Sequence, residues 1–467
     1  MPEQIPRSIA VVDVGYTNTK VVQFDANGKI IAERKSQSIH NDGALYREIN
    51  ADLIMAFCGE ALRALDAETP IDVIVPCAHG AAQAAIKASG DLAVPVMDYM
   101  SEAPEDIVAA YRKIEPSFSE VYGPLLPMTL THGLQLYWQS QSFPKEFTEI
   151  AAIMPWIQYI TFRLSGVAVS EISGLSCQSQ LMNINTGKPS SLAVAQGWAN
   201  LYAPRANAWE RVGTLLPSIA GTQFQGRGQV LAGVHDSNAN YLRYLAGGYE
   251  HFTLLSTGTW IIGFDTDADI NLLDHELDTV TNTNIFGRPV ACCRFFGGQE
   301  FAILAQGAAG DLAAIATVQD LIDQDIFAIA SFTDSGGPLP NTGNKGKVLG
   351  PMTETPDHRA SLAALYCALM VDLSLNAIQS KAQIIVDGPF AENPVFLQIL
   401  AALRPQQQVS ASKLSQGTTA GAACLGLMPD GKLPYLPMSL TEVQPPELRG
   451  LAAYARTWLK ISKSQNP

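Results

Sequence analysis

The sequence has few charged residues of either sign and no excess of basic ones. Of its 467 residues only 16% are Asp, Glu, Lys or Arg, and the formal net charge is −14. Nucleic acids and anionic membrane surfaces select for basic patches, so this balance argues against both as partners. A polyanionic ligand would have to be held by local groups, such as backbone amides, a magnesium ion or a single lysine.

Several specific patterns are also missing. The seven cysteines show no CxxC pair and no Cys/His ligand spacing, so neither a disulfide framework nor a structural zinc site is expected. There is no GxxxxGK[ST] phosphate loop. We find no run of ~18 apolar residues, which predicts that no segment spans a membrane. The first residues, Met1–Ser8, lack the apolar core of a signal peptide, so a reduced, cytoplasmic protein is expected.

The clearest local pattern lies at the start of the chain. An apolar run, Ile9–Gly15, ends in a short polar loop, and a second run, Lys20–Asp25, leads into an Asn-Gly turn and a third run. Asn-Gly between such runs is a strong hairpin signal. A helical pattern at about Leu45–Leu65 and a strand pattern at Ile71–Val75 follow. The order β-β-β-α-β implies a mixed sheet flanked by helices.

This opening pattern recurs about 245 residues later, where His251–Ser256, a Thr-Gly-Thr loop and Trp260–Asp265 repeat the strand–loop–strand order. A chain of 467 residues is too long for one ordinary core, and two domains of roughly 200 residues are expected. The repeat predicts that the two domains are similar and face each other across a cleft. We place their limits at 1–247 and 248–467.

The loop after the first strand has the groups needed to hold phosphate. Gly15 allows the backbone to turn so that successive N–H groups converge into an anion nest. Thr17 and Asn18 add short polar groups, and Lys20 can supply a cation. Asp13, at the end of the strand, can hold magnesium, usually through water. An ordinary hairpin turn rich in Gly, Thr and Asn would look the same, so the loop alone does not decide.

The second loop, Ser256–Trp260, contains Gly258 and Thr259. Taken by itself it is better explained as a plain hairpin turn. As the repeat partner of the first loop it gains weight, because one nest from each domain would together hold one triphosphate.

A carboxylate suited to phosphoryl transfer precedes the second domain. Asp236 lies at the start of a helix, where in isolation it would be assigned as an N-cap. Transfer to an alcohol needs a carboxylate that accepts the hydroxyl proton, and Asp236 suits that role, with His235 bonding a sugar hydroxyl. His79, Gly80 and Asp98 follow expected strands and could face a polyol, although a structural role explains His79 equally well.

The segment Gly388–Asn393 follows the apolar strand pattern Gln383–Asp387 and precedes a helix that opens with Pro394. Such strand–turn–helix connections often hold adenine and ribose through backbone groups. Any connection between a strand and a helix can have this form, so the segment is informative only together with the others.

Five segments together resemble one known family. They are Asp13–Lys20, Gly233–Ser237, Ser256–Trp260, Gly388–Asn393 and Gly417–Ala423, in the order seen in FGGY carbohydrate kinases of the actin, Hsp70 and hexokinase superfamily. The stretch Leu134–Gly166 also resembles a helical pair of that family. The similarity covers about residues 9 to 430. It implies an α/β fold with two ribonuclease H-like (actin-like ATPase) domains, each with a mixed five-stranded sheet flanked by helices.

The resemblance also implies roles for single residues. Asp236 matches the proton acceptor, and Asp13 and Asp236 are the carboxylates associated with magnesium. The expected nucleotide contacts are Gly15, Thr17, Asn18, Lys20, Gly258, Thr259, Gly388 and Asn393. The expected sugar contacts are His79, Gly80, Asp98, His235, Ser237 and Asn282.

The implied reaction moves the γ-phosphoryl of ATP, as its Mg²⁺ complex, to a small sugar, in a monomer or homodimer. The His-Asp pair and the Ser-Thr-Gly-Thr-Trp string look most like rhamnulokinases and L-fuculokinases, whose substrates are 6-deoxy-ketoses. Alternatives are kinases for xylulose, ribulose, erythritol or glycerol, and a non-catalytic actin- or Hsp70-like nucleotide-binding protein. The sequence departs from the family at Tyr16, which replaces a small residue, and at Ser335–Pro338, where many members carry Gly-Glu-Arg-x-Pro.

Overall fold

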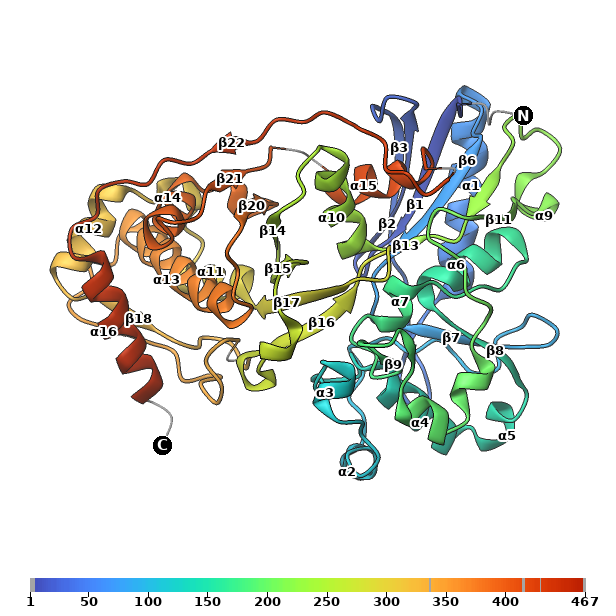
Figure 1. The fold of residues 1–467 in the computed structure, drawn as a ribbon, viewed down its shortest axis with the longest axis horizontal. Helices are drawn as coiled ribbons and strands as arrows, with labels where there is room; N and C mark the ends of the chain where they lie inside the picture. Colours follow the sequence, from blue (N-terminus) through green and yellow to red (C-terminus); the bar gives the residue numbers. More distant parts are fainter. Residues whose placement is uncertain (1–4, 336, 414–415, 429, 465–467) are drawn as a thin grey trace. The chain divides into compact units, whose positions relative to one another are not determined.

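The computed structural model describes residues 5–335, 337–413, 416–428 and 430–464, and the chain forms two compact units (Figure 1). The first comprises Met1–Tyr249, Thr281–Pro289 and Gln416–Pro437, and the second comprises Glu250–Val280, Val290–Ser415 and Met438–Pro467. Two segments that come after Tyr249 in the sequence, Thr281–Pro289 and Gln416–Pro437, therefore fold with the first unit. The limits 1–247 and 248–467, which treat each domain as continuous, stay a prediction.

The first unit contains a large sheet, several small strand pairs and helices of varied length. Its elements are β1 (Ser8–Val14), β2 (Asn18–Asp25), β3 (Ile30–Gln37), β4 (His40–Asp42), β5 (Arg47–Ile49), α1 (Ala51–Glu68), β6 (Val73–Ala78), β7 (Gln83–Lys87), α2 (Glu105–Tyr111), α3 (Phe118–Val121), α4 (His132–Ser142), α5 (Pro144–Phe147), β8 (Ile150–Pro155), α6 (Trp156–Ser165), α7 (Ile172–Ser176), β9 (Met182–Asn183), β10 (Lys188–Pro189), α8 (Ser191–Ala195), η1 (Trp198–Leu201), β11 (Arg211–Thr214), α9 (Pro217–Ala220), β12 (Gln229–Leu231), β13 (Val234–His235), α10 (Asp236–Ala246) and α15 (Gly417–Leu425).

The large sheet of the first unit has seven strands and is mixed. Its order is β11-β12-β6-β1-β2-β3, and β13 also pairs with β6. The β1–β2–β3 meander is antiparallel, whereas β6 runs parallel to β1, β12 and β13. The expected mixed sheet is confirmed, but the expected count of five strands was too low. The extra strands arise because β11 adds an edge and because the last parallel strand is divided into β12 and β13.

Alternating side chains of β1 contribute to two different hydrophobic cores of this unit, as expected for a strand covered on both faces. Ala10, Val12 and Val14 pack with α1 and α6, whereas Ile9 and Val11 pack with α10 and α15. Figure 1 shows α15, drawn in red, beside the blue strands, although it is far from them in sequence. The sheet is thus flanked by helices on both faces.

Two expected helices differ in the structure. The helix expected from Leu45 begins only at Ala51, because the β4–β5 hairpin precedes it and Asn50 caps the helix by accepting from the Leu53 N–H. The stretch Leu134–Gly166, which resembles a helical pair, contains a strand, β8, directly before α6. Here the antiparallel pairing of β8 with β7 outweighs the helical spacing of the apolar residues.

The second unit repeats the strand arrangement and adds a central helix. Its elements are β14 (Phe252–Thr257), β15 (Ile261–Asp265), η2 (Ile270–Leu272), η3 (His275–Leu277), β16 (Thr279–Thr283), β17 (Pro289–Phe295), α11 (Gly297–Ala305), η4 (Gly310–Leu312), α12 (Ile315–Asp323), β18 (Phe327–Ile329), β19 (Lys347–Leu349), α13 (Pro356–Ala377), β20 (Gln383–Asp387), η5 (Pro389–Glu392), α14 (Pro394–Leu403), β21 (Val409–Ala411), β22 (Thr441–Glu442) and α16 (Leu451–Ser464).

Its sheet has the order β16-β17-β15-β14-β20-β21-β22. The strands β14, β15 and β17 form an antiparallel meander, and β20 runs parallel to β14. These pairings reproduce those of β1, β2, β3 and β6, so the internal repeat expected from the sequence is present in the fold.

One helix of the second unit is unusually apolar. The helix α13 is long and apolar enough to cross a membrane by length and composition alone, although charged and polar residues interrupt it and it contains no run of ~18 apolar residues. Most of its residues are buried, and α11, α12 and α14 pack against it. Its position is that of the central core helix of this unit.

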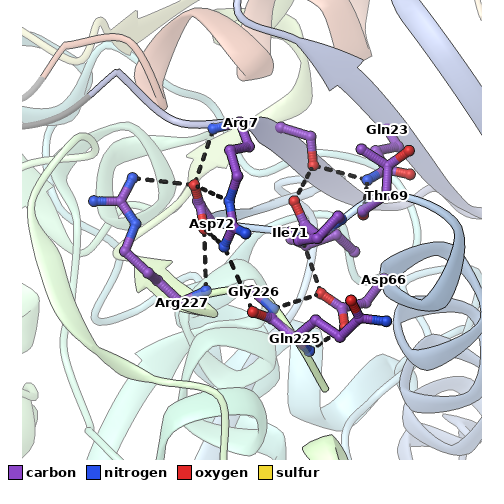
Figure 2. Close-up of polar contacts among 11 residues, drawn as sticks. Arg7, Gln23, Asp66, Thr69, Ile71, Asp72, Gln225, Gly226 and Arg227 are labelled. Atoms are coloured by element: carbon purple, nitrogen blue, oxygen red, sulfur yellow. Dashed lines mark hydrogen bonds and ion pairs between the residues drawn. The ribbon is translucent and has the colours of Figure 1, made fainter. Parts of the chain in front are cut away.

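Two buried carboxylates, Asp66 and Asp72, connect separate segments of the first unit at the end of the sheet where β6 begins (Figure 2). Asp72 accepts hydrogen bonds from the backbone and side chains of Arg7 and Arg227. Asp66 accepts from the backbone N–H groups of Ile71, Gln225 and Gly226. Together they hold the start of β1, the end of α1 and the loop before β12 in one cluster.

The pKa of Asp72 sets a pH dependence for stability. Burial alone would raise the pKa of this carboxyl, but the bonds from Arg7 and then Arg227 outweigh it and lower the pKa below its usual range. A depressed pKa in the folded state gives stability that is present above the unfolded value, near 4, and is lost as the pH falls toward the folded value.

We therefore expect Asp72→Asn to lower the free energy of unfolding at pH 7 by about 2 kcal/mol, because charge-assisted hydrogen bonds are lost. Urea unfolding measured from pH 7 to pH 3 checks this, with Asp42→Asn as control because the Asp42 side chain is 98% exposed. The difference from the wild-type protein should shrink below pH ~4. A difference that is constant over this range would contradict the assignment.

Candidate active site

Asp13 and Asp236 lie at neighbouring strand ends in the first unit. Asp13 is the last residue but one of β1 and pairs in register with Cys77 of β6. On the other side of β6, Val234 of β13 also pairs with Cys77, and Asp236 follows that strand as the first residue of α10. In open α/β sheets ligands bind beyond the carboxyl ends of the parallel strands, which is where these carboxylates are.

The two carboxylates have different environments, which shift their pKa values in opposite directions. Burial, with a smaller contribution from the charge of Asp236, raises the pKa of Asp13 to about 7 against the opposing effect of Lys20, its register partner on β2. Burial would also raise the pKa of Asp236, but the hydrogen bond from His235 outweighs it and keeps that pKa below its usual value. Asp236 is therefore ionised at neutral pH and able to accept a proton.

This pair fits a magnesium ion better than a metal that prefers a full protein cage. Mg²⁺ is usually bound by one or two carboxylates together with substrate phosphates. Within the described ranges there is no group of three or more His, Cys, Asp or Glu side chains that could hold a metal. A divalent cation near Asp13 and Asp236 would also relieve their mutual repulsion.

In the loop after β1, three successive carbonyl groups are turned toward the segment that follows β3. Ser38 donates its hydroxyl to the Gly15 carbonyl at 2.7 Å and its N–H to the Thr17 carbonyl at 3.0 Å. His40 Nε2 lies 2.9 Å from the carbonyl oxygen of Tyr16. Because the N–H and C=O of a trans peptide point in opposite directions, the N–H groups after these carbonyls face away from Ser38 and His40. This is the orientation that an anion nest requires.

The corresponding loop of the second unit is held by glycine contacts. The Gly258 N–H bonds to the Trp260 carbonyl at 2.9 Å, and the Thr259 carbonyl accepts from the Gly298 N–H at 3.1 Å. A Cβ at Gly298 would overlap the Gly258 carbonyl. The start of α11 can therefore approach the loop only because residue 298 is glycine.

The segment Gly388–Asn393 also depends on close backbone packing. Gly388 has φ +87°, and a Cβ there would overlap the Thr257 carbonyl. The Thr257 hydroxyl accepts from the Phe390 N–H at 3.1 Å. Asn393 is the N-cap of α14, and its Oδ1 accepts a hydrogen bond from the Phe396 N–H. Its Nδ2 lies 3.0 Å from the point that a Cβ added to Gly310 would occupy. Any contact of Asn393 with a nucleoside would have to come from its amide nitrogen or backbone.

Gly80, Cys177 and His235 meet at the carboxyl end of β6. A Cβ at Gly80 would lie 2.7 Å and 2.8 Å from the His235 ring and in hard contact with Cys177 Sγ. The thiol lies 3.5 Å from His235 Nε2, which is in turn 3.1 Å from Asp236 Oδ1. Cys177 was not predicted as part of this site, since no spacing in the sequence relates it to Gly80 and His235.

His235 and Ser237 both act on the carboxylate between them. Burial alone would lower the pKa of His235, but the adjacent Cys177 and Asp236 raise it well above its usual value. Ser237 donates its N–H to Asp236 Oδ1 at 2.6 Å and its hydroxyl at 3.2 Å. His235 occupies the N-cap position of α10, so the alternative that Asp236 is the N-cap was wrong.

Aromatic rings connect the first loop with His79. The ring of His79 packs edge-on against Tyr99 at 5.5 Å, Tyr99 lies 4.8 Å from Tyr16, and Tyr16 lies 4.6 Å from His40. Burial lowers the pKa of His79 to about 4, so its imidazole is neutral at pH 7. Its buried Nδ1 has no hydrogen-bond partner among the described residues. His79 therefore has a ring nitrogen available for a substrate hydroxyl.

Asp98 does not face a polyol as expected. Its side chain is fully buried and lies 3.0 Å from His40 Nδ1, 3.6 Å from Arg47 Nε and 3.3 Å from the Tyr16 hydroxyl. These partners are protein groups, so we reassign Asp98 to holding Tyr16 and His40 beside the phosphate loop. Asn282 is buried in the segment that folds with the first unit, and its role stays a prediction. Gly336, within Ser335–Pro338, lies outside the described residues.

Family models cover nearly the whole chain. The N-terminal domain of the FGGY family of carbohydrate kinases matches residues 8–242, and the C-terminal domain of the carbohydrate kinase FGGY family matches residues 249–434. The chain is a member of the FGGY family of carbohydrate kinases. The resemblance stated from the five sequence segments is thereby confirmed.

Solved structures agree with this membership. A carbohydrate kinase from Novosphingobium aromaticivorans is 32% identical, with a TM-score of 0.89 over 99% of this chain and 100% of the other. A xylulose kinase from Rhodospirillum rubrum shares the fold, with a TM-score of 0.79, 17% identity and coverage of 99% of both chains. An L-fuculokinase from Salmonella typhi is 24% identical over 264 residues, 54% of this chain and 55% of that protein. The chain thus spans just over half the length of that curated relative.

We expect Gly80→Ala in this FGGY family member to displace Cys177 or the His235 ring, because the added Cβ has no room. Overpacking of this kind costs about 1–3 kcal/mol, and sugar-dependent ADP release should fall at least about tenfold if the ring moves. Gly123→Ala is the matched control, since a Cβ there meets only one atom, at 3.7 Å. Equal turnover in both variants would show that this contact is not part of the active site.

Proposed function

We propose that the protein transfers the γ-phosphoryl of ATP, as its Mg²⁺ complex, to a hydroxyl of a small ketose. Membership of the family supports a carbohydrate kinase, and the proposal adds the acceptor and the roles of individual residues. The observation that carries it is the ionised Asp236 beside Asp13, next to a loop whose N–H groups face one side.

Asp236 acts as the general base in this proposal. It accepts the proton of the attacking hydroxyl as the oxygen–phosphorus bond forms, a role worth ~10²–10⁴-fold in rate. The bonds from Ser237 and His235 hold the carboxylate in place and keep it ionised. Magnesium, associated with Asp13 and Asp236, supplies charge neutralisation at the phosphate oxygens.

Nucleotide binding draws on both units. In the first unit, the backbone of Gly15, the side chains of Thr17 and Asn18, and the cation of Lys20 contact phosphate. In the second unit, the loop containing Gly258 and Thr259 contacts phosphate, and the segment containing Gly388 and Asn393 contacts the nucleoside. The orientation of the first loop's N–H groups supports this assignment.

The acceptor site lies in the first unit, with hydroxyl contacts from His79, His235, Ser237 and the backbone at Gly80. We favour a 6-deoxy-ketose such as L-rhamnulose or L-fuculose. The relative named L-fuculokinase supports this choice, as does the ring of Tyr99 beside His79, because an aromatic ring suits a methyl group better than a hydroxyl.

The test is ADP release with ATP and Mg²⁺ across L-rhamnulose, L-fuculose, the xyluloses, ribulose, gluconate, glycerol and erythritol, with Asp236→Asn run alongside. We expect turnover on one 6-deoxy-ketose and a loss of ~10²–10⁴-fold in the variant, with nucleotide affinity retained. The asparagine keeps an oxygen that can accept from Ser237, so the local fold should persist.

Other outcomes each change the proposal. Turnover on a different sugar would replace the acceptor and keep the base. Near-normal turnover in Asp236→Asn would remove Asp236 from its role. Nucleotide binding with no turnover on any sugar would favour a non-catalytic nucleotide-binding protein.

A further inference from the structure

The strand that precedes Asp236, β13, has an edge beside α7 that pairs with no other strand of the described chain. β13 pairs with β6 on one side, while β12, which pairs with the first half of β6, has ended before it. Between them, Gly233 has φ +87°, and a Cβ there would lie 2.6 Å from the Pro76 carbonyl. The backbone N–H groups on the other edge of β13 therefore need partners that are not strands.

Ser173 supplies the partner for the His235 N–H. The Ser173 hydroxyl oxygen accepts this N–H at 3.3 Å and donates its own proton to Glu171 Oε2 at 2.5 Å. A hydroxyl has one proton and two lone pairs, so a proton committed to the carboxylate leaves a lone pair for His235. Glu171 thus fixes the orientation in which Ser173 can hold the backbone beside Asp236.

Glu171 is a buried carboxyl group that the proposed reaction does not use. It is fully buried, and its Oε2 also accepts the N–H groups of Ser173 at 2.9 Å and Gly174 at 3.3 Å. Burial raises the pKa of this carboxyl, and the bonds from Ser173 and Gly174 act against that shift. A Ser side chain would cap this five-residue helix without burying a carboxyl group.

The backbone on the N-terminal side of Gly233 is also fixed by hydrogen bonds from side chains. The Ala232 carbonyl accepts from the Thr161 hydroxyl at 2.8 Å and from Gln158 Nε2 at 3.1 Å, and both donors lie on α6. The backbone that leads to Asp236 is therefore fixed before and after Gly233 by side chains that are fully buried.

We propose that Ser173, oriented by Glu171, is a positioning residue that fixes the backbone of His235 and so the place of the Asp236 carboxylate. The proposal rests on the proposed function only for the role of Asp236 as the base. A displacement of the carboxylate by ~1 Å is enough to lower turnover on the order of 100-fold, without contact between Ser173 and substrate.

Ser173→Ala tests this, because the backbone bonds from residues 173 and 174 to Glu171 remain and only the hydroxyl is lost. Ser176→Ala is the matched control: Ser176 lies on the same helix, is buried, and donates only to the Ile172 carbonyl at 2.7 Å. We expect kcat to fall ~10- to 100-fold in Ser173→Ala, with KM for ATP within about twofold, and to stay near wild type in Ser176→Ala.

A second readout does not depend on the reaction. Hydrogen–deuterium exchange of the peptide that covers residues 232–236 should be faster in Ser173→Ala than in Ser176→Ala at similar melting temperature, because the His235 N–H has lost its partner. Ser173→Thr, which keeps the hydroxyl, should restore slow exchange and most of kcat.

Equal exchange in the two alanine variants would overturn the proposed contact, and faster exchange with unchanged kcat would overturn the positioning role. If Ser173→Ala does not fold, Ser173→Cys keeps the shape with a weak acceptor, and an unchanged kcat there would also refute the proposal. If Asp236→Asn keeps its turnover, the proposed function fails separately, and the exchange comparison still decides whether Ser173 holds the strand.

Discussion

The first unit is organised around one unfavourable interaction, between the buried Asp13 carboxylate and the partly exposed Asp236 carboxylate, which lie at the ends of two strands that flank β6. Asp13 and Asp236 come together because β1 and β13 both run parallel to β6. Burial, and to a smaller extent the charge of Asp236, raise the pKa of Asp13 to about 7, which means that its ionised form is destabilised in the folded protein. Such an arrangement persists only where the surrounding backbone is over-determined, and this region is fixed by paired strands, helix starts and buried side-chain bonds.

Positions without a side chain make this fixation possible. Gly80 leaves room for the His235 ring and Cys177, and Gly233 lets β13 approach the Pro76 carbonyl. In the second unit, Gly298 and Gly388 allow the same kind of close contact around the loop at Gly258 and the end of β14. The geometry of the candidate site is therefore set largely by the backbone, and the polar side chains act on a frame that is already in place.

The sequence predicted what is local and missed what depends on distant contacts. The strand–loop–strand repeat, the loop at Gly15 and the Asp236 position were predictable, because turn residues and alternating apolar residues are visible within a few positions. Asp98 was misjudged because its partners His40 and Arg47 are more than fifty residues away from it. The strand β8, within the stretch that resembles a helical pair, was not predicted because its pairing with β7 is a tertiary effect.

The polar groups at the two ends of β6 differ in how far protein contacts satisfy them. Before it, Asp72 is satisfied by two arginines, and its pKa is lowered, so the charge contributes to folding. After it come His79, with a buried ring nitrogen that has no partner in the described chain, and the neighbouring Asp13 with a raised pKa. Groups that protein contacts leave unsatisfied are the ones able to bind a substrate, a metal or a proton. It follows that the ion cluster before β6 offsets part of the free energy that the arrangement after β6 costs.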